Sequence, residues 1–310
     1  MTEPRPPKMD VHGWIVLDKP VGMTSTQGVA VVKRLMRAKK AGHAGTLDPL
    51  ASGLLPIALG EATKTVPFVM DGRKIYRFTV RWGAETDTDD TEGSVIATSH
   101  ARPARHEIEA LLPRYTGLIR QVPPKFSAIK VDGERAYDLA REGEDVRLEA
   151  REIEIHSLRI VDAAADEATF EAECGKGTYV RAIARDLGRD LGCHGHVVGL
   201  RRAAVGPFDE RDAVTPDELR AMKDGQGTLP PVEDALLPVE TALEALPSLA
   251  VSRHDAGRLC RGQSVILRGR DAPLFEGPAA VLSGGILVAL AELEHGELVP
   301  KRIFHLGALG

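Results

Sequence analysis

Asp48 is the residue whose neighbours in the sequence point first to chemistry. It stands in the segment AGHAGTLDPLASG, residues 41–53, where glycines and a proline among small side chains predict a loop. A carboxylate on a glycine-rich turn can act as a nucleophile or a base, because glycines let another backbone approach closely. Alternatively, Asp48 only fixes the turn before Pro49. The segment by itself leaves both interpretations open.

A helix with arginines on one face is the second candidate. Apolar residues in GKGTYVRAIARDLG recur with helical spacing and predict a helix from Thr178 to Gly188, with Gly188 as its terminator. Arg181, Arg185 and Arg189 would share a different face. An arginine on such a face is usually solvated.

The rest of the chain supplies the elements that must position these motifs. Residues 75–82, IYRFTVRW, alternate and predict a strand with Tyr76 on the apolar face, where an aromatic residue usually belongs to the core. GWIVLD at 13–18 predicts another strand, and 24–40 predicts a helix with the basic end KRLMRAKK. Strands and helices mix without regular β-α-β order, which indicates an α+β fold.

The net charge of −5 and the pI near 6.1 argue against a nucleic-acid partner, but the local distribution of charge argues for one. Residues 1–50 carry eight Lys or Arg against four acids, and residues 174–202 carry six against two. Residues 203–247 hold ten acids against three bases. We therefore expect the basic segments 33–40 and 176–202 to meet phosphates.

The three cysteines include no Cys-x-x-Cys pair, which fits neither a disulfide framework nor a zinc ribbon. The start, MTEPRPPKMDVHG, has no apolar signal core, and no apolar run approaches the roughly 18 residues of a membrane helix. We expect a soluble, cytoplasmic protein without a membrane partner.

Five blocks carry a specific resemblance: GWIVLDKPVGMTS, GHAGTLDPLASGLLPIALGEATK, KIYRF, GKGTYVRAIARDLG and GLRRAAVGPF. From about Gly13 to Phe208 the chain resembles the bacterial TruB family, whose members make pseudouridine at position 55 in the T-loop of tRNA. The resemblance implies the pseudouridine-synthase fold, with a mixed, mainly antiparallel central sheet flanked by helices and a small C-terminal β domain of the PUA-like type. It also implies an isomerase that uses no cofactor and no metal.

The resemblance further implies which residues carry the chemistry. Asp48 would be the catalytic aspartate, Arg181 would form an ion pair with it, and Tyr76 would stack on the uracil. Asp90, in TDTDDTEG, would complete the charge network.

Other positions are implied to handle the flipped base. His43 would occupy the space that the extruded nucleotide leaves, and Tyr179 and Leu200 would line the uracil pocket. Lys19 and Pro20 belong to a motif that we interpret as structural support beneath the pocket.

The expected domains are a catalytic unit at 1–247 and a PUA-like RNA-binding unit at 248–310. Within the first, the polar segment at about 123–151 resembles the family's thumb, where Lys130 and Arg141 are candidate phosphate contacts. The expected partner is tRNA, bound through its T-arm and its acceptor stem. We expect a monomer with no obligate protein partner.

Three motif-like segments are set aside. GKGT lacks the glycine and Lys-Ser/Thr order of a P-loop, DTDDTEG lacks the glycine of a calcium loop, and Cys193, His194 and His196 lack the spacing of a metal site. Two rival functions stay open: an RNA-binding or RNA-folding protein without chemistry, and a guide-directed enzyme that acts on another RNA.

Overall fold

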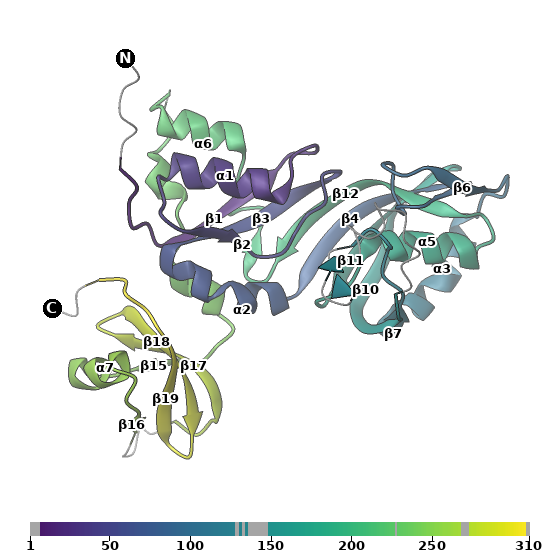
Figure 1. Ribbon diagram of the computed structural model, residues 1–310. Helices are drawn as coiled ribbons and strands as arrows, with labels where there is room; N and C mark the ends of the chain where they lie inside the picture. The colour runs from purple at the N-terminus through teal and green to yellow at the C-terminus, as the bar shows by residue number, and fades with distance from the viewer. Residues whose placement is uncertain are drawn as a thin grey trace.

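One large mixed sheet and a second, smaller sheet form the framework of the molecule (Figure 1). The structure is a computed structural model that describes residues 7–127, 130–131, 134–135, 148–226, 228–267 and 273–307. Within these residues the large sheet has ten strands in the order β14-β1-β3-β12-β4-β11-β10-β7, with β2 paired to β3 and β13 to β12. They are β1 (Gly13–Lys19), β2 (Ala41–His43), β3 (Ala51–Leu59), β4 (Lys74–Trp82), β7 (Gly117–Gln121), β10 (Arg151–Ala163), β11 (Glu167–Cys174), β12 (Gly195–Val205), β13 (Phe208–Asp209) and β14 (Ala213–Val214).

Of the strand pairs described in this sheet, β1–β14 and β3–β12 are parallel and the others are antiparallel. The predicted mixed, mainly antiparallel sheet is confirmed. The two parallel pairs join segments that lie far apart in the sequence, and β3–β12 is the pair beside Asp48.

The predicted strand over 75–82 is β4, which begins one residue earlier. Phe78, Val80 and Trp82 are buried, and Arg77 and Arg81, which alternate with them, face solvent, as a strand requires. Tyr76 stands in the same stripe but is only half-buried. Its partial exposure separates it from the core residues that follow it.

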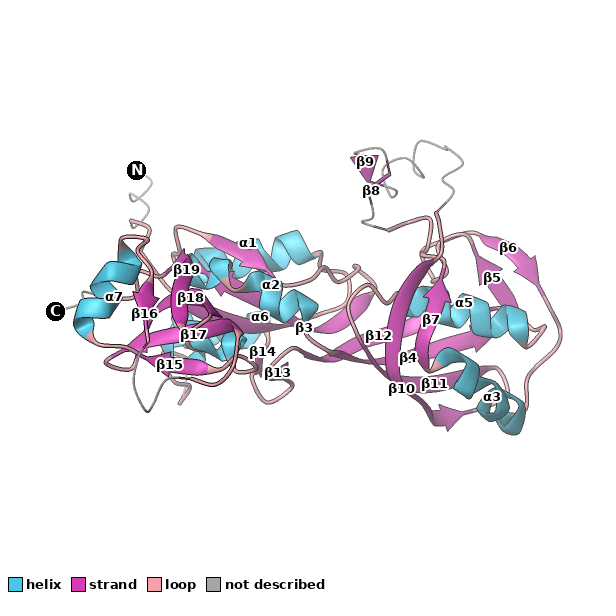
Figure 2. Cartoon of the chain, turned by 90° about the horizontal axis from the view of Figure 1, so that it is seen from below, coloured by secondary structure: helices cyan, strands magenta, loops and turns pink. Residues whose placement is uncertain are grey.

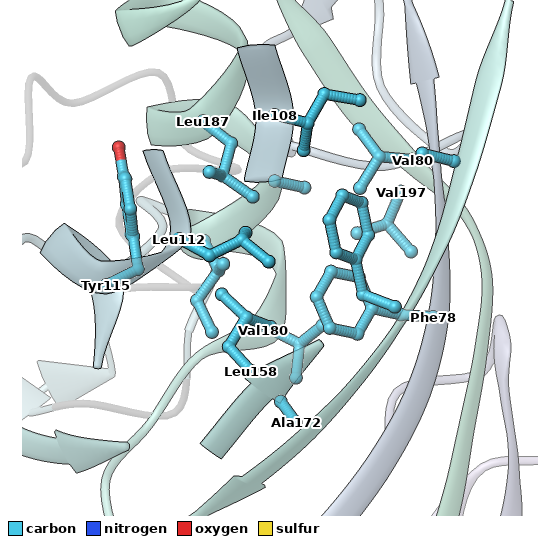
Figure 3. Packing of buried hydrophobic residues seen from close by; sticks show 14 of the residues in the cluster. Phe78, Val80, Ile108, Leu112, Tyr115, Leu158, Ala172, Val180, Leu187 and Val197 are labelled. Carbon is cyan, nitrogen blue, oxygen red and sulfur yellow. The ribbon is translucent and has the colours of Figure 1, made fainter. Parts of the chain in front are cut away.

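The main core lies between this sheet and two helices, α5 (Val180–Asp190) and α3 (Arg105–Leu111) (Figure 3). Val180 and Leu187 of α5 point toward Phe78 on β4. The ring of Phe78 stacks on Phe170 of β11, with 5.3 Å between the ring centroids. This packing fixes the helix that carries Arg181 against the strand that carries Tyr76.

The C-terminal end of α5 differs from the prediction. Gly188 does not terminate the helix, which continues to Asp190 and is followed by Gly192 at φ +68°. A Cβ at Gly188 would come within 2.3 Å of the backbone nitrogen of Gly195. Glycine is needed there because β12 begins in direct contact with the helix.

The first helix and the loop after it also differ. α1 (Ser25–Leu35) ends before the predicted Lys40, because Arg37 takes a left-handed conformation at φ +53° and its carbonyl accepts a hydrogen bond of 2.8 Å from the amide of Met9. The segment 41–53, predicted as one loop, contains β2 and the start of β3 at its ends. Residues 44–50 form its irregular part.

The predicted C-terminal β unit is confirmed as a five-stranded sheet in the order β15-β17-β18-β19-β16, with a helix beside it. It shares a hydrophobic cluster with the large sheet, to which Phe304 and Trp14 both belong. Lys64 donates a hydrogen bond of 2.7 Å to the carbonyl of Ile303 across the same interface. The elements are β15 (Ser248–Ala250), α7 (Arg253–Cys260), β16 (Val265–Ile266), β17 (Gly277–Ser283), β18 (Ile286–Glu294) and β19 (Glu297–Ile303).

The remaining elements surround the large sheet (Figure 2). α6 (Pro216–Lys223) lies beside α1, α2 (Val66–Asp71) follows β3, and β5 (Ala84–Thr86) pairs with β6 (Val95–Thr98). The predicted lobe at 123–151 includes β8 (Lys130–Val131) and β9 (Glu134–Arg135), but much of it, with Arg141, lies outside the described residues. Among the helices that the structure describes, none is long and apolar enough to cross a membrane.

Candidate active site

Asp48 lies in the irregular segment between β2 and β3, and the start of α1 holds this segment in place. The hydroxyl of Ser25 donates to the carbonyl of Leu47 at 3.0 Å and accepts from the amide of Leu47 at 2.9 Å. On the other side, the amide of Gly22 donates to the carbonyl of Pro49 at 2.7 Å. The backbone is therefore fixed on both sides of the carboxylate.

Arg181 and Asp48 form an ion pair, with 3.0 Å between Nη2 and Oδ2. The arginine lies in the first turn of α5 and its side chain is 7% exposed, so it is not a solvated helix residue. The Asp48 side chain is 38% exposed. The carboxylate thus has a buried cation behind it and an open side in front.

Asp90 completes the network from the opposite side of Arg181. Its Oδ2 is 3.3 Å from Nη1 of the arginine, and its Oδ1 accepts hydrogen bonds from the hydroxyl of Thr88 and the amide of Glu92. Arg181 also donates to the carbonyls of Thr88 and Phe126, each at 2.9 Å. The guanidinium is therefore held by several acceptors and points one edge at Asp48.

A cavity of about 430 Å³ opens beside the ion pair. Its walls bring together five of the predicted site residues, which come from four separate parts of the chain. A volume of this size is typical of sites for small molecules or single nucleotides. The predicted residues in the walls are Asp48, Tyr76, Tyr179, Arg181 and Leu200.

The two tyrosines are placed by different elements. Tyr76 comes from β4, while Tyr179 precedes α5, where the side chain of Gln121 bonds both its amide and its carbonyl, at 2.9 and 3.1 Å. Burial raises the pKa of both phenols above its usual value. Both phenols therefore keep their protons near pH 7.

His43 lies on β2 and is not part of the cavity wall. Burial, and next the charge of Arg202, lower its pKa, so its imidazole is neutral near pH 7. Its Nδ1 is buried without a hydrogen-bond partner in the described chain. The structure therefore leaves it near the Asp48 segment but outside the cavity.

Lys19 and Pro20 fit the structural interpretation. Lys19 is fully buried and donates to the carbonyls of Pro20 and Met23, at 3.1 and 2.8 Å. Burial lowers the pKa of Lys19 to about 8, against the charge of Asp48, which raises it. The lysine thus braces the turn that precedes α1.

Two models of one protein family match the chain in sequence. The TruB family pseudouridylate synthase N-terminal domain matches residues 33–180, and the tRNA pseudouridylate synthase B C-terminal domain matches residues 181–244. The chain belongs to the TruB family. It is accordingly an enzyme, a pseudouridine synthase of the isomerase class.

Similar proteins cover nearly the whole chain of this TruB-family member. The tRNA pseudouridine synthase B of Rhodopseudomonas palustris is 65% identical over 99% of this chain and 84% of its own length. That of Bradyrhizobium diazoefficiens is also 65% identical, over 97% and 88%. A solved H/ACA RNP bound to a substrate RNA containing 2′-deoxyuridine has a similar fold, with a TM-score of 0.73 and 25% identity over 96% of this chain and 86% of that one.

Two residues of the TruB-type cavity were missed in the sequence. Lys74 and Arg202 both line it and are 8% and 1% exposed. Both stand inside family blocks, in KIYRF and GLRRAAVGPF, but nothing in the alternation of those blocks shows which cations turn inward. A family alignment is the signal that could have found them.

The structure contradicts the expectation of phosphate contacts for half of the bases in the segment 176–202. Arg181, Arg185 and Arg202 are buried. The other bases of the segment form ion pairs, namely Lys176 with Asp71, Arg189 with Glu85, and Arg201 with Asp18 and Glu210. Half of these bases therefore lie inside the TruB fold, whereas the side chains of Lys176 and Arg189 remain 70% and 53% exposed beside their ion-pair partners.

Proposed function

We propose that this chain isomerises uridine 55 in the T-loop of tRNA to pseudouridine. The observation that carries the proposal is the Asp48–Arg181 pair at the wall of a cavity that also contains Tyr76. The 65% identity to two enzymes named tRNA pseudouridine synthase B supports tRNA as the substrate class.

The chemistry follows from what the cavity offers. A base inside a folded loop is out of reach, so it must be extruded and held by stacking, here on Tyr76 with Tyr179 and Leu200 around it. The open side of Asp48 then faces the ribose, where an ionised carboxylate assists the break of the C–N bond. The uracil rotates in place and its C5 bonds to the ribose carbon, so the isomerisation needs no cofactor.

The same proposal covers the partners and the division of the chain. Residues 1–247 would bind the T-arm and carry out the reaction, and 248–310 would bind the acceptor stem as a PUA-like unit. We propose a cytoplasmic monomer that needs no protein partner.

The test is pseudouridine mapping on an unmodified tRNA transcript incubated with the purified chain, without added metal, cofactor or guide RNA. We expect product at position 55, none in a transcript with cytidine at that position, and product also in an isolated T-arm stem-loop. No product despite tight binding would favour the RNA-folding function. No product without a guide, and product with one, would favour the guide-directed enzyme.

Binding of tRNA should weaken with salt through the segment 33–40. Arg34 and Lys40 are exposed there, and neither forms an ion pair with a described residue. The double variant R34Q/K40Q should flatten the plot of log K against log salt by about 2 units, since each lost phosphate contact removes about 1. R189Q, which loses a base already paired with Glu85, should leave the slope unchanged. If the double variant had the same slope as wild type, this segment would not contact the RNA.

A further inference from the structure

Arg202 is a buried cation whose role the proposed mechanism leaves unexplained. It lies on β12 and is 1% exposed. Its Nε donates to the carbonyl of Leu54 at 2.8 Å and its Nη2 to the carbonyl of Gly45 at 3.1 Å. Among the described residues, no carboxylate lies within ion-pair distance of it, whereas the adjacent Arg201 is paired with Asp18 at 2.9 Å. A buried charge without a counter-charge is costly, and it persists where a function uses it.

The Asp48 segment is folded around this arginine. In the sheet, Arg202 is opposite Gly53 on one side and opposite Tyr76 on the other. Gly53 has φ +99°, and a Cβ there would lie 2.2 Å from the backbone oxygen of Arg202. Gly45 has φ +98°, and a Cβ there would lie 3.3 Å from Nη1. Both glycines of the segment with left-handed backbones therefore make room for Arg202.

The charge of Arg202 acts on the cavity. The arginine lines it together with Asp48 and Tyr76. After burial, it is the main cause that lowers the pKa of His43 and of Lys74, and it opposes the rise that burial causes in the pKa of Tyr76. Three groups around the Asp48 segment thus respond to one fixed positive charge. When a base fills the cavity and displaces water from it, such a charge favours an anion.

We propose that Arg202 stabilises the uracil as an anion while its bond to the ribose is broken. The inference rests on the proposed function. When the C1′–N1 bond breaks, its electron pair stays on N1 and spreads to O2 and O4 of the base. The ribose is balanced by a bond from the Asp48 carboxylate to C1′ or by loss of its 2′ proton to that carboxylate. In both cases the base carries one negative charge until C5 bonds to C1′. As that bond forms, the Asp48–C1′ bond breaks or the 2′ carbon regains its proton from Asp48. C5 then loses its proton and N1 gains one.

The test compares leaving groups. Single-turnover rates are measured for wild type, R202Q and R202K on tRNA with uridine or 5-fluorouridine at position 55, following disappearance of the original nucleoside. Fluorine withdraws electrons and stabilises the departing anion by itself. R202Q keeps a hydrogen-bond donor but no charge, and should be about 10²-fold slower on uridine, as when one charge-stabilising group is lost from an active site. On 5-fluorouridine, the rate of R202Q should be no more than about tenfold below that of wild type, because the substrate then supplies part of that stabilisation.

R202K keeps the charge, so its single-turnover rate should fall by the same factor on both substrates. The neighbour variant R201M should likewise show equal losses, and tRNA affinity should be unchanged in all of them. Equal losses for R202Q on the two substrates would make Arg202 a purely structural clamp and overturn the proposal. Weaker tRNA binding by R202Q, with normal rates at saturation, would assign the charge to an RNA phosphate and overturn it too. Inactivity of wild type on both substrates would instead refute the proposed function.

Discussion

The variant D48N should form pseudouridine at least about 10⁴-fold more slowly than wild type, a loss typical of removing the central group of a catalytic set. Asparagine has the same shape as aspartate but cannot act as an anionic nucleophile or base. The fold should tolerate it, because the segment is held through the backbone of Leu47 and Pro49 and not through the carboxylate. Affinity for tRNA should therefore stay within a few-fold of wild type.

Single-turnover mapping and filter binding on the same transcript measure both quantities. The matched control is D18N, since Asp18 is also paired with an arginine of the same sheet, Arg201 at 2.9 Å, but does not line the cavity with Asp48. D18N should keep most of the activity. If D48N kept more than about one hundredth of the wild-type rate, the carboxylate would not be the central group.

The variant R181K should be slower by about 10²- to 10³-fold, with a measurable loss of stability as well. Lysine keeps the charge but offers one compact head group, whereas Arg181 reaches Asp48, Asp90 and two carbonyls at once. Its single ammonium cannot stay within 3.0 Å of Asp48 and still satisfy the buried Asp90. The carboxylate at the cavity is then poorly oriented.

The comparison is with R189K, two turns further along α5, where the arginine is paired with the buried Glu85 far from the cavity. Thermal unfolding and single-turnover rates are recorded for both variants. R189K should lose stability without a matching loss of rate per folded molecule. If R181K lost stability alone, the ion pair would be structural and Asp48 would act without it.

Local pattern was enough for some of the elements, and the clearest example is β4. The alternation of IYRFTVRW fixes its faces, since a strand has only two. Alternation along β12 does not predict which of Arg201 and Arg202 is buried. The strand contains register shifts, and the two arginines differ only in the side of the sheet that they face. The prediction of where α1 ends was wrong for another reason. The hydrogen bond between Met9 and Arg37 is a tertiary contact, and helix propensity does not take such contacts into account.

The pairing of Asp48 with Arg181 came from the family resemblance, not from spacing. The two residues belong to segments that no local rule connects, and without the resemblance the solvated interpretation of Arg181 would have been preferred. The side chain of Arg181 is only 7% exposed, so that interpretation would have been wrong. Conversely, the count of charges over 176–202 was misleading for Arg181, Arg185 and Arg202, because such a count does not show which side chains are buried.

The parallel pair β3–β12 also determines at which stage of folding the cavity beside Asp48 forms. Arg202 reaches the carbonyl of Leu54, and Ser52 reaches that of Leu200, across 148 residues of sequence in each case. Closing a loop of that length is slow and comes after local hairpins and helices have formed. The floor of the cavity therefore exists only once the sheet has been completed across its middle. A partly folded chain contains Asp48 but not the completed cavity, so we expect the site to form late, together with the native state.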